Sequence, residues 1–280
     1  MVNQMSVKII ALDLDGTLMA TDHLTVSPAN REAIKNAHDA GVKIAISTGR
    51  TIAIMGDVCE QVPQGDYVMY SNGAGVMDRK TGKNIYTSFM SNKLFKEVLD
   101  YLDDKPVFIE VYVDGKSYVQ EDKADYFISE SLPKEFLESL LGNMTICQNL
   151  TEAINGKDVE KLTAYCKYPD IFDEIWRHLN EMGELSVASS LKGNIDITKA
   201  GVNKGVALDG MCKTLGIGAD EAMAFGDAGN DCPMLEYAKY SFAMENGSEE
   251  CKNAAKHITK SNAEDGVAYA INQYVNSKNK

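Results

Sequence analysis

The stretch Val7-Lys-Ile-Ile-Ala-Leu-Asp-Leu-Asp-Gly-Thr-Leu18 decides the fold of this 280-residue chain. Its first half is rich in Val, Ile and Leu, which is typical of a strand buried on both faces of a sheet. Asp13 and Asp15 follow directly, and side chains two positions apart on an extended chain point to the same side. Gly16 then lets the chain turn tightly. Because α/β sheets bind ligands beyond the carboxyl ends of their strands, the stretch predicts an acidic site there.

The two carboxylates also predict a bound cation. Two acids this close repel each other, and keeping both ionised is costly unless a cation lies between them. Mg²⁺ is the natural candidate, because it is a hard cation that prefers oxygen ligands. A solvated Asp-Gly turn is the alternative reading of residues 13–17 taken alone.

The chain on both sides of this stretch alternates strands with helices. Ser27 and Pro28 suit the start of a helix, and Gly41 suits its end. Such a β-α-β order is typical of a parallel sheet covered by helices, so we expect an α/β fold. The expected helices are 30–40, 51–61, 204–215 and 231–237, and the expected strands are 7–13, 42–47, 67–70, 222–225 and 241–244.

The middle of the chain has a different texture. Asp114-Gly115 is a dipeptide favoured in two-residue hairpin turns, and short apolar runs lie on both sides of it. Further strand-like and helix-like segments follow without a regular alternation. We therefore expect an inserted α+β domain at 85–193 and a discontinuous core formed by 1–84 and 194–280.

Three further polar segments follow expected strands or open expected helices. In Ser47-Thr-Gly-Arg50, a hydroxyl followed by free N–H groups at a helix start can hold a phosphate oxygen. Lys204 could neutralise both a phosphate and clustered carboxylates. Asp227 and Asp231 are four positions apart, so they would share one face of a helix. Taken singly, each segment also fits an ordinary cap, turn or helix-opening lysine.

Their joint order of acid pair, hydroxyl, lysine and acid pair resembles the haloacid dehalogenase-like phosphatases, and most closely their Cof-type branch. The resemblance covers essentially the whole chain. It implies a Rossmann-like parallel-sheet core, with the insert as a C2-type cap that closes over the site and selects the leaving group. The matching segments are the opening stretch, Ser47-Thr-Gly-Arg50, Ser71-Asn-Gly-Ala74, Val202-Asn-Lys-Gly205, Gly226-Asp-Ala-Gly-Asn-Asp231 and Thr259-Lys-Ser-Asn-Ala-Glu-Asp-Gly-Val267.

The resemblance also implies an enzyme, a phosphoric monoester hydrolase that depends on Mg²⁺. Asp13 would be the nucleophile that forms an aspartyl phosphate, and Asp15 would be the general acid and then the general base. The Asp13 carboxylate, the Asp15 carbonyl and Asp227 would hold the metal, and Asp231 would orient a water on it. The residues expected to contact phosphate or substrate are Thr48, Gly49, Lys204, Asn230 and Asn72, with Thr48 and Lys204 also counted as catalytic.

The composition of the chain indicates which kinds of partner and which cellular compartment to expect. The net charge of −13 argues against nucleic acid, although cations inside a pocket still allow a small phosphorylated metabolite. The longest apolar runs are too short to span a bilayer, and the start of the chain does not resemble a signal peptide. Six cysteines without a Cys-x-x-Cys pair favour reduced thiols in a cytoplasmic protein. The four histidines show no metal-ligand spacing.

We expect a monomer or a weak homo-oligomer that acts on small metabolites, with sugar phosphates as the leading class. A phosphomutase would use the same motifs and is the alternative enzyme. A non-catalytic phosphate-binding module would be favoured by loss of Asp13 or Asp15, and both are present. An unrelated nucleotide-binding fold needs a Gly-x-Gly-x-x-Gly loop where this chain has Asp-Leu-Asp-Gly-Thr.

Overall fold

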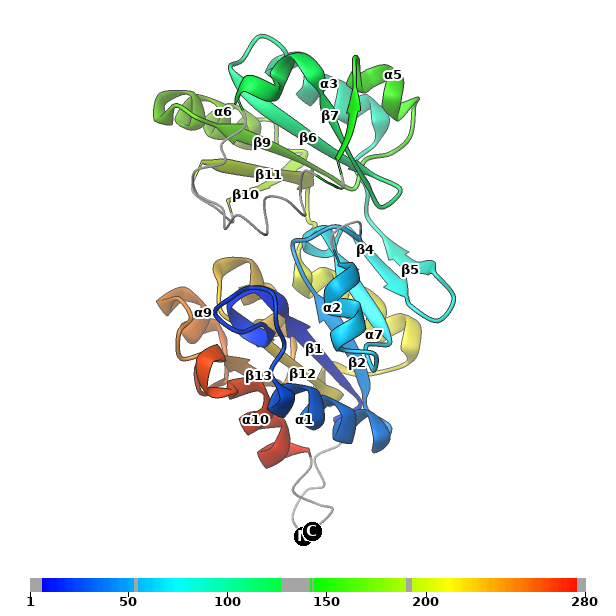
Figure 1. Ribbon diagram of the computed structural model, residues 1–280, viewed down its shortest axis with the longest axis vertical. Coiled ribbons are helices and arrows are strands. Elements are labelled where there is room, and N and C mark those ends of the chain that lie inside the picture. The colour runs from blue at the N-terminus through cyan, green and yellow to red at the C-terminus, as the bar shows by residue number, and fades with distance from the viewer. Residues whose placement is uncertain (1–6, 53–54, 127–141, 143, 190–192, 276–280) are drawn as a thin grey trace. The chain divides into compact units, whose positions relative to one another are not determined.

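The computed structural model describes residues 7–52, 55–126, 142, 144–189 and 193–275. The chain forms two compact units (Figure 1). The first unit consists of Met1–Gly49, Met55–Thr87 and Asn203–Lys280, and the second of Arg50–Ile54 and Ser88–Val202. The first unit is thus built from both ends of the chain.

The sheet of the first unit has the strand order β14-β13-β12-β1-β2-β3-β4-β5. Strands β14 to β3 of this order run parallel, whereas β4 and β5 are antiparallel additions. The strands are β1 (Ile9–Asp13), β2 (Lys43–Ser47), β3 (Tyr67–Tyr70), β4 (Gly75–Asp78), β5 (Lys83–Thr87), β12 (Ala222–Gly226), β13 (Tyr240–Ala243) and β14 (His257–Ile258).

Strand β1 lies between β2 and β12, and all five of its residues are buried. Ile9 and Ala11 pack in one cluster with Leu208 of helix α7 (Lys204–Leu215) and Leu235 of helix α8 (Cys232–Tyr237). Side chains alternate along a strand, so Ile10 faces the opposite side of the sheet, where it is also fully buried. Burial on both faces explains why this strand reads as a continuous apolar run.

The helices of the first unit begin and end where their capping residues require. The Ser27 side chain accepts a hydrogen bond from the backbone of Asn30 at the start of α1, and Pro28 occupies its first turn. Asn203 caps α7, and Gly216 ends it with a positive φ of 68°. The helices are α1 (Pro28–Asp39), α2 (Gly56–Gln61), α7 (Lys204–Leu215), α8 (Cys232–Tyr237), α9 (Glu249–Ala254) and α10 (Gly266–Tyr274).

The second unit has its own sheet, with the order β10-β11-β9-β6-β7-β8. Helices α3 and α6 cover one face of it (Figure 1), where Phe95 and Ile175 pack against Ile109 and Leu162. The elements are α3 (Asn92–Leu102), β6 (Val107–Val113), β7 (Lys116–Gln120), β8 (Met144–Cys147), α5 (Leu150–Ile154), β9 (Lys161–Cys166), α6 (Pro169–Glu181), β10 (Leu185–Ala188) and β11 (Asn194–Lys199).

The α/β fold class expected from the sequence is confirmed. Asp114 and Gly115 form the expected turn between β6 and β7, with positive φ angles of 52° and 70°. Helix α2 is shorter than expected and begins at Gly56. The bounds of the expected insert, 85–193, stay a prediction. In this part of the chain the two compact units divide at 87/88 and 202/203. Strand β11 lies beyond residue 193 and pairs with β9 and β10, so it belongs to the sheet of the second unit. Among the described residues, no helix is both long enough and apolar enough to cross a bilayer.

Candidate active site

The site begins where β1 ends. Asp13 is the last residue of this strand and is only 6% exposed. Asp15 lies in the turn Leu14–Leu18 with its side chain 43% exposed. Gly16 has a positive φ of 83°, and a Cβ atom there would lie 2.4 Å from Oδ2 of Asp227. Only glycine therefore allows this turn to pass so close to Asp227.

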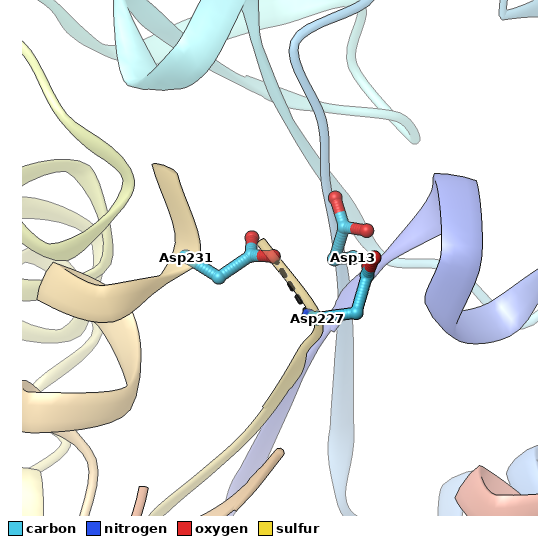
Figure 2. Close-up of side chains that lie close together, drawn as sticks. All are labelled: Asp13, Asp227 and Asp231. Carbon is cyan, nitrogen blue, oxygen red and sulfur yellow. Dashed lines mark hydrogen bonds between the residues drawn. The ribbon is translucent and has the colours of Figure 1, made fainter. Parts of the chain in front are cut away.

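Asp227 and Asp231 come from the end of the neighbouring strand β12. The Oδ2 atom of Asp231 accepts hydrogen bonds from the backbone N–H groups of Asp227, at 3.0 Å, and Ala228, at 3.1 Å. Figure 2 draws the first of these bonds and shows the Asp231 carboxylate facing Asp13 and Asp227. Asp13, Asp227 and Asp231 each offer one carboxylate oxygen, and the three oxygens lie within 4.8 Å of one another.

Lys204 connects two of these carboxylates. It is the first residue of α7 and only 1% exposed. Its Nζ atom donates to Oδ1 of Asp13 and to Oδ1 of Asp231, both at 2.6 Å. Charge-assisted bonds of this length are among the stronger contacts in proteins, so the lysine fixes both acids.

The charges in the cluster do not balance, because three carboxylates face one ammonium group. Burial and the nearby Asp231 raise the pKa of Asp13 well above its usual range, although Lys204 opposes this. Burial and Asp231 likewise raise the pKa of Asp227 to about 6. Burial works against the charge of Lys204, but Asp13 and Asp231 more than offset it and hold the pKa above its ordinary value. Excess buried negative charge suits a cation.

Besides Lys204, the residues expected to contact phosphate or substrate follow the ends of β2, β3 and β12. Thr48 follows β2 and is 1% exposed, and its backbone N–H donates to the Met69 carbonyl at 2.9 Å. Asn230 donates from Nδ2 to Oδ1 of Asn72 at 3.1 Å. A Cβ atom on Gly49 would lie 3.0 Å from that same oxygen. Asn72 is therefore the common neighbour of Gly49 and Asn230.

The structure adds three polar residues that the sequence did not single out. Thr17 donates from Oγ1 to Oδ1 of Asp227 at 2.8 Å, and its place in the opening stretch was a usable signal. Nδ1 of His23 lies 3.3 Å from Oδ1 of Asp15. Asn246 donates from Nδ2 to the Gly16 carbonyl at 2.8 Å. No sequence spacing indicates His23 or Asn246, because loop packing alone brings them here.

Three comparisons show which known proteins this chain is similar to. The sequence model of the haloacid dehalogenase-like hydrolase family matches residues 10–271. The chain is 33% identical to a 5-amino-6-(5-phospho-D-ribitylamino)uracil phosphatase of Bacillus subtilis, over 97% of this chain and 99% of the relative.

Solved structures share the fold. A haloacid dehalogenase-like hydrolase from B. subtilis superposes with a TM-score of 0.81 at 24% identity, covering 96% of this chain and 100% of the other. A subclass IIB sugar phosphatase of the same superfamily gives a TM-score of 0.78 at 24% identity, covering 96% and 99%. At these identities the likeness extends to the fold alone.

Proposed function

The chain belongs to the haloacid dehalogenase-like hydrolases as a phosphatase, and we propose that it hydrolyses small phosphorylated metabolites with Mg²⁺, through an aspartyl phosphate on Asp13. The observation that carries the proposal is the pair of 2.6 Å bonds from Lys204 to Asp13 and Asp231. They hold a carboxylate at a strand end beside a buried positive charge. This arrangement suits a carboxylate that must remain ionised and attack an anionic group.

The residues present fit a magnesium ion. Two buried carboxylates, Asp13 and Asp231, and the half-buried Asp227 cluster here, and their excess negative charge matches a divalent cation that prefers oxygen ligands. The Asp13 carboxylate, the Asp15 carbonyl and Asp227 would hold the ion, and Asp231 would orient a water on it. When bound, Mg²⁺ would neutralise phosphate charge and favour the ionised forms of Asp13 and Asp227.

The reaction would proceed in two steps. In the first, an Asp13 oxygen forms a bond to phosphorus as the bond between phosphorus and the leaving oxygen breaks. Asp15 gives its proton to that oxygen. In the second, Asp15 takes a proton from water, which attacks phosphorus and releases inorganic phosphate from Asp13. The 43% exposure of the Asp15 side chain supports its access to a leaving group.

The transferring phosphoryl group carries negative charge on its outer oxygens, and these need donors. We propose that Thr48, Gly49, Lys204 and Asn230 supply them. The strand pairing supports this assignment for Thr48 and Gly49. Ser47, the last residue of β2, pairs with Asp13 of β1, and Thr48 and Gly49 follow Ser47 directly. Lys204 already contacts the proposed nucleophile.

Sugar phosphates are the proposed substrate class. The B. subtilis relative is named for a substrate whose phosphate sits on a ribityl chain, which is polyhydroxylated like a sugar. One of the structural neighbours is likewise a sugar phosphatase. We place the protein in the cytoplasm, as a monomer or weak homo-oligomer acting on small metabolites; the six free cysteines are in keeping with a reducing compartment.

The test is a phosphate-release screen over sugar phosphates, phosphorylated ribityl compounds, nucleotides and phosphorylated organic acids, with and without Mg²⁺. Asp13→Asn serves as the blank, since an amide cannot form the acyl phosphate, and its turnover should fall by ~10³-fold or more. When the wild-type enzyme reacts with a substrate labelled in its phosphoryl group and is then quenched with acid, the label should be bound to Asp13 and should be released by hydroxylamine. Full activity in Asp13→Asn would contradict the proposal, and an isomeric sugar phosphate formed instead of inorganic phosphate would identify a phosphomutase.

A further inference from the structure

The turn Ser71–Gly73, between β3 and β4, has an unusual backbone. Ser71, Asn72 and Gly73 have consecutive positive φ angles of 50°, 56° and 95°. Ser71 is fully buried and Asn72 is 9% exposed. Residues other than glycine carry strain in this conformation, and they keep it only where their surroundings hold them in place. Strain of this kind often marks a site whose geometry matters for function.

One backbone hydrogen bond and one close approach place this turn against the elements that carry the proposed phosphate-binding residues. The N–H of Asn72 donates to the Thr48 carbonyl at 3.0 Å. A Cβ atom on Gly73 would lie 2.5 Å from the carbonyl oxygen of Asn203, the residue that caps α7 just before Lys204. The turn is thus packed between the end of β2 and the start of α7.

The Asn72 side chain reaches a third element. Its Oδ1 atom accepts a hydrogen bond from Nδ2 of Asn230 at 3.1 Å. Asn230 lies in the short turn Gly229–Asp231, between Asp227 and Asp231. An amide nitrogen has two N–H donors, and the bond to Asn72 engages one of them. That bond also determines which end of the Asn230 amide is held toward Asn72, so the second N–H has a defined direction.

We propose that Asn72 is a positioning residue, which orients the Asn230 amide for the transferring phosphoryl group and does not contact the substrate itself. The inference rests on the proposed function, in which Asn230 donates to that group. It assigns Asn72 a different part from the substrate contact expected from the sequence. The strained backbone is then explained, because a left-handed residue at this position places the side chain between Gly49 and Asn230.

A double-mutant cycle tests the proposal. Asn72→Gly removes the side chain but keeps a residue that tolerates a positive φ, and Asn230→Ala removes the oriented amide. The assay is kcat/KM on an aryl phosphate with Mg²⁺, together with inhibition by orthovanadate, which mimics the five-coordinate phosphorus. Each single variant should lose ~10–100-fold in kcat/KM, as is usual for groups that orient a site. Inhibition by vanadate should weaken in parallel.

The double variant should match Asn230→Ala within ~3-fold, because Asn72 acts through Asn230. Asn155→Gly is the matched control: Asn155 also has a positive φ, of 50°, but it is exposed at the end of α5 in the second unit, so kcat/KM should be unchanged.

Wild-type kcat/KM in Asn72→Gly would overturn the inference, and so would losses that multiply in the double variant. A fully active Asn230→Ala would refute the role of Asn230 and this inference with it, while the label on Asp13 would still report on the proposed function separately.

Discussion

Lys204 donates a 2.6 Å hydrogen bond to Oδ1 of Asp13, although 191 positions separate the two residues in the chain. Both side chains are almost inaccessible to water, with 0% and 8% of their surfaces exposed. The same ammonium group also contacts Asp231. One buried cation therefore compensates two buried anions, and its removal would leave both uncompensated.

Lys204→Met should destabilise the fold in a pH-dependent way. Breaking a buried ion pair by removing one partner costs about 3–5 kcal/mol. The carboxyl pKa of Asp13 is already raised in the folded chain by burial and Asp231, and loss of the lysine raises it further. Stability linked to a raised carboxyl pKa is lost as pH rises, so the deficit should be larger at pH 8 than at pH 5.

Urea unfolding at both pH values measures this difference. Lys213→Met is the control on the same helix, because Lys213 is 75% exposed and pairs with Asp209 on the surface. Its effect should stay within about 0.5 kcal/mol at either pH, as for most exposed ion pairs. A deficit of equal size at pH 5 and pH 8 would contradict the electrostatic role of Lys204.

Gly16→Ala should reduce both stability and activity. Its φ of 83° alone disfavours alanine by about 1–2 kcal/mol. The new Cβ would also lie 2.4 Å from Oδ2 of Asp227, so Asp227 or the turn must move. A displaced Asp227 should lower kcat/KM by ~10-fold or more, because small misplacements in a site have large effects on rate.

Gly41→Ala separates the two causes. Gly41 has a similar φ of 91°, but nothing lies within 4 Å of its Cβ position. The Gly41→Ala variant should lose a comparable amount of stability, because alanine is disfavoured at this φ, and it should keep the wild-type kcat/KM. If the activity of Gly16→Ala matched that of Gly41→Ala, the close approach to Asp227 would be irrelevant to catalysis.

Stabilisation by Mg²⁺ should increase with pH. The pKa of Asp227 is raised from its ordinary value of 3.8 to about 6, so the metal-free folded chain binds this proton more tightly than the unfolded chain. That contribution is lost as pH rises from about 4 to about 6. A metal ion binds the ionised carboxylate, so the Mg²⁺-induced rise in Tm should be larger at pH 7.5 than at pH 5.

Differential scanning fluorimetry with and without Mg²⁺ checks this expectation. Asp227→Asn should abolish most of the shift, whereas Asp39→Asn, at an exposed ion pair on α1, should leave it intact. Chelation should also remove activity, and Ca²⁺ should restore it poorly, because its coordination is larger and looser. Activity that survives exhaustive chelation would show that the carboxylate cluster has another purpose.

Asp15→Asn should separate good leaving groups from poor ones. A sugar alkoxide leaves poorly without a proton, so its cleavage should slow by ~10²–10⁴-fold. An activated aryl phosphate needs little protonation, and its phosphorylation of Asp13 should slow much less. Dephosphorylation would still lack its base, so label should accumulate after an initial burst of aryl alcohol. Pre-steady-state kinetics measures both steps, and equal slowing for the two leaving groups would defeat the assignment.

The features of this protein that its sequence predicts are those that local residue patterns determine. Burial on both faces makes β1 a continuous apolar run, and Ser27 with Pro28 defines the start of α1. The positions of Asp13 and Asp15 after a strand follow from the same local pattern. The order of the polar segments along the chain carries the family resemblance, and the resemblance in turn implies the roles of the proposed nucleophile and of Lys204.

The tertiary structure alone decided which of these groups touch. Lys204 contacts Asp13 and Asp231, and Asn230 donates to Asn72. Asn72 has a left-handed backbone, which an asparagine in the sequence indicates less clearly than a glycine would. The close approach of Gly16 to Asp227 likewise exists only because β12 pairs with β1. Strand pairing and hydrogen-bond partners join residues far apart in the chain, so local propensity cannot determine them.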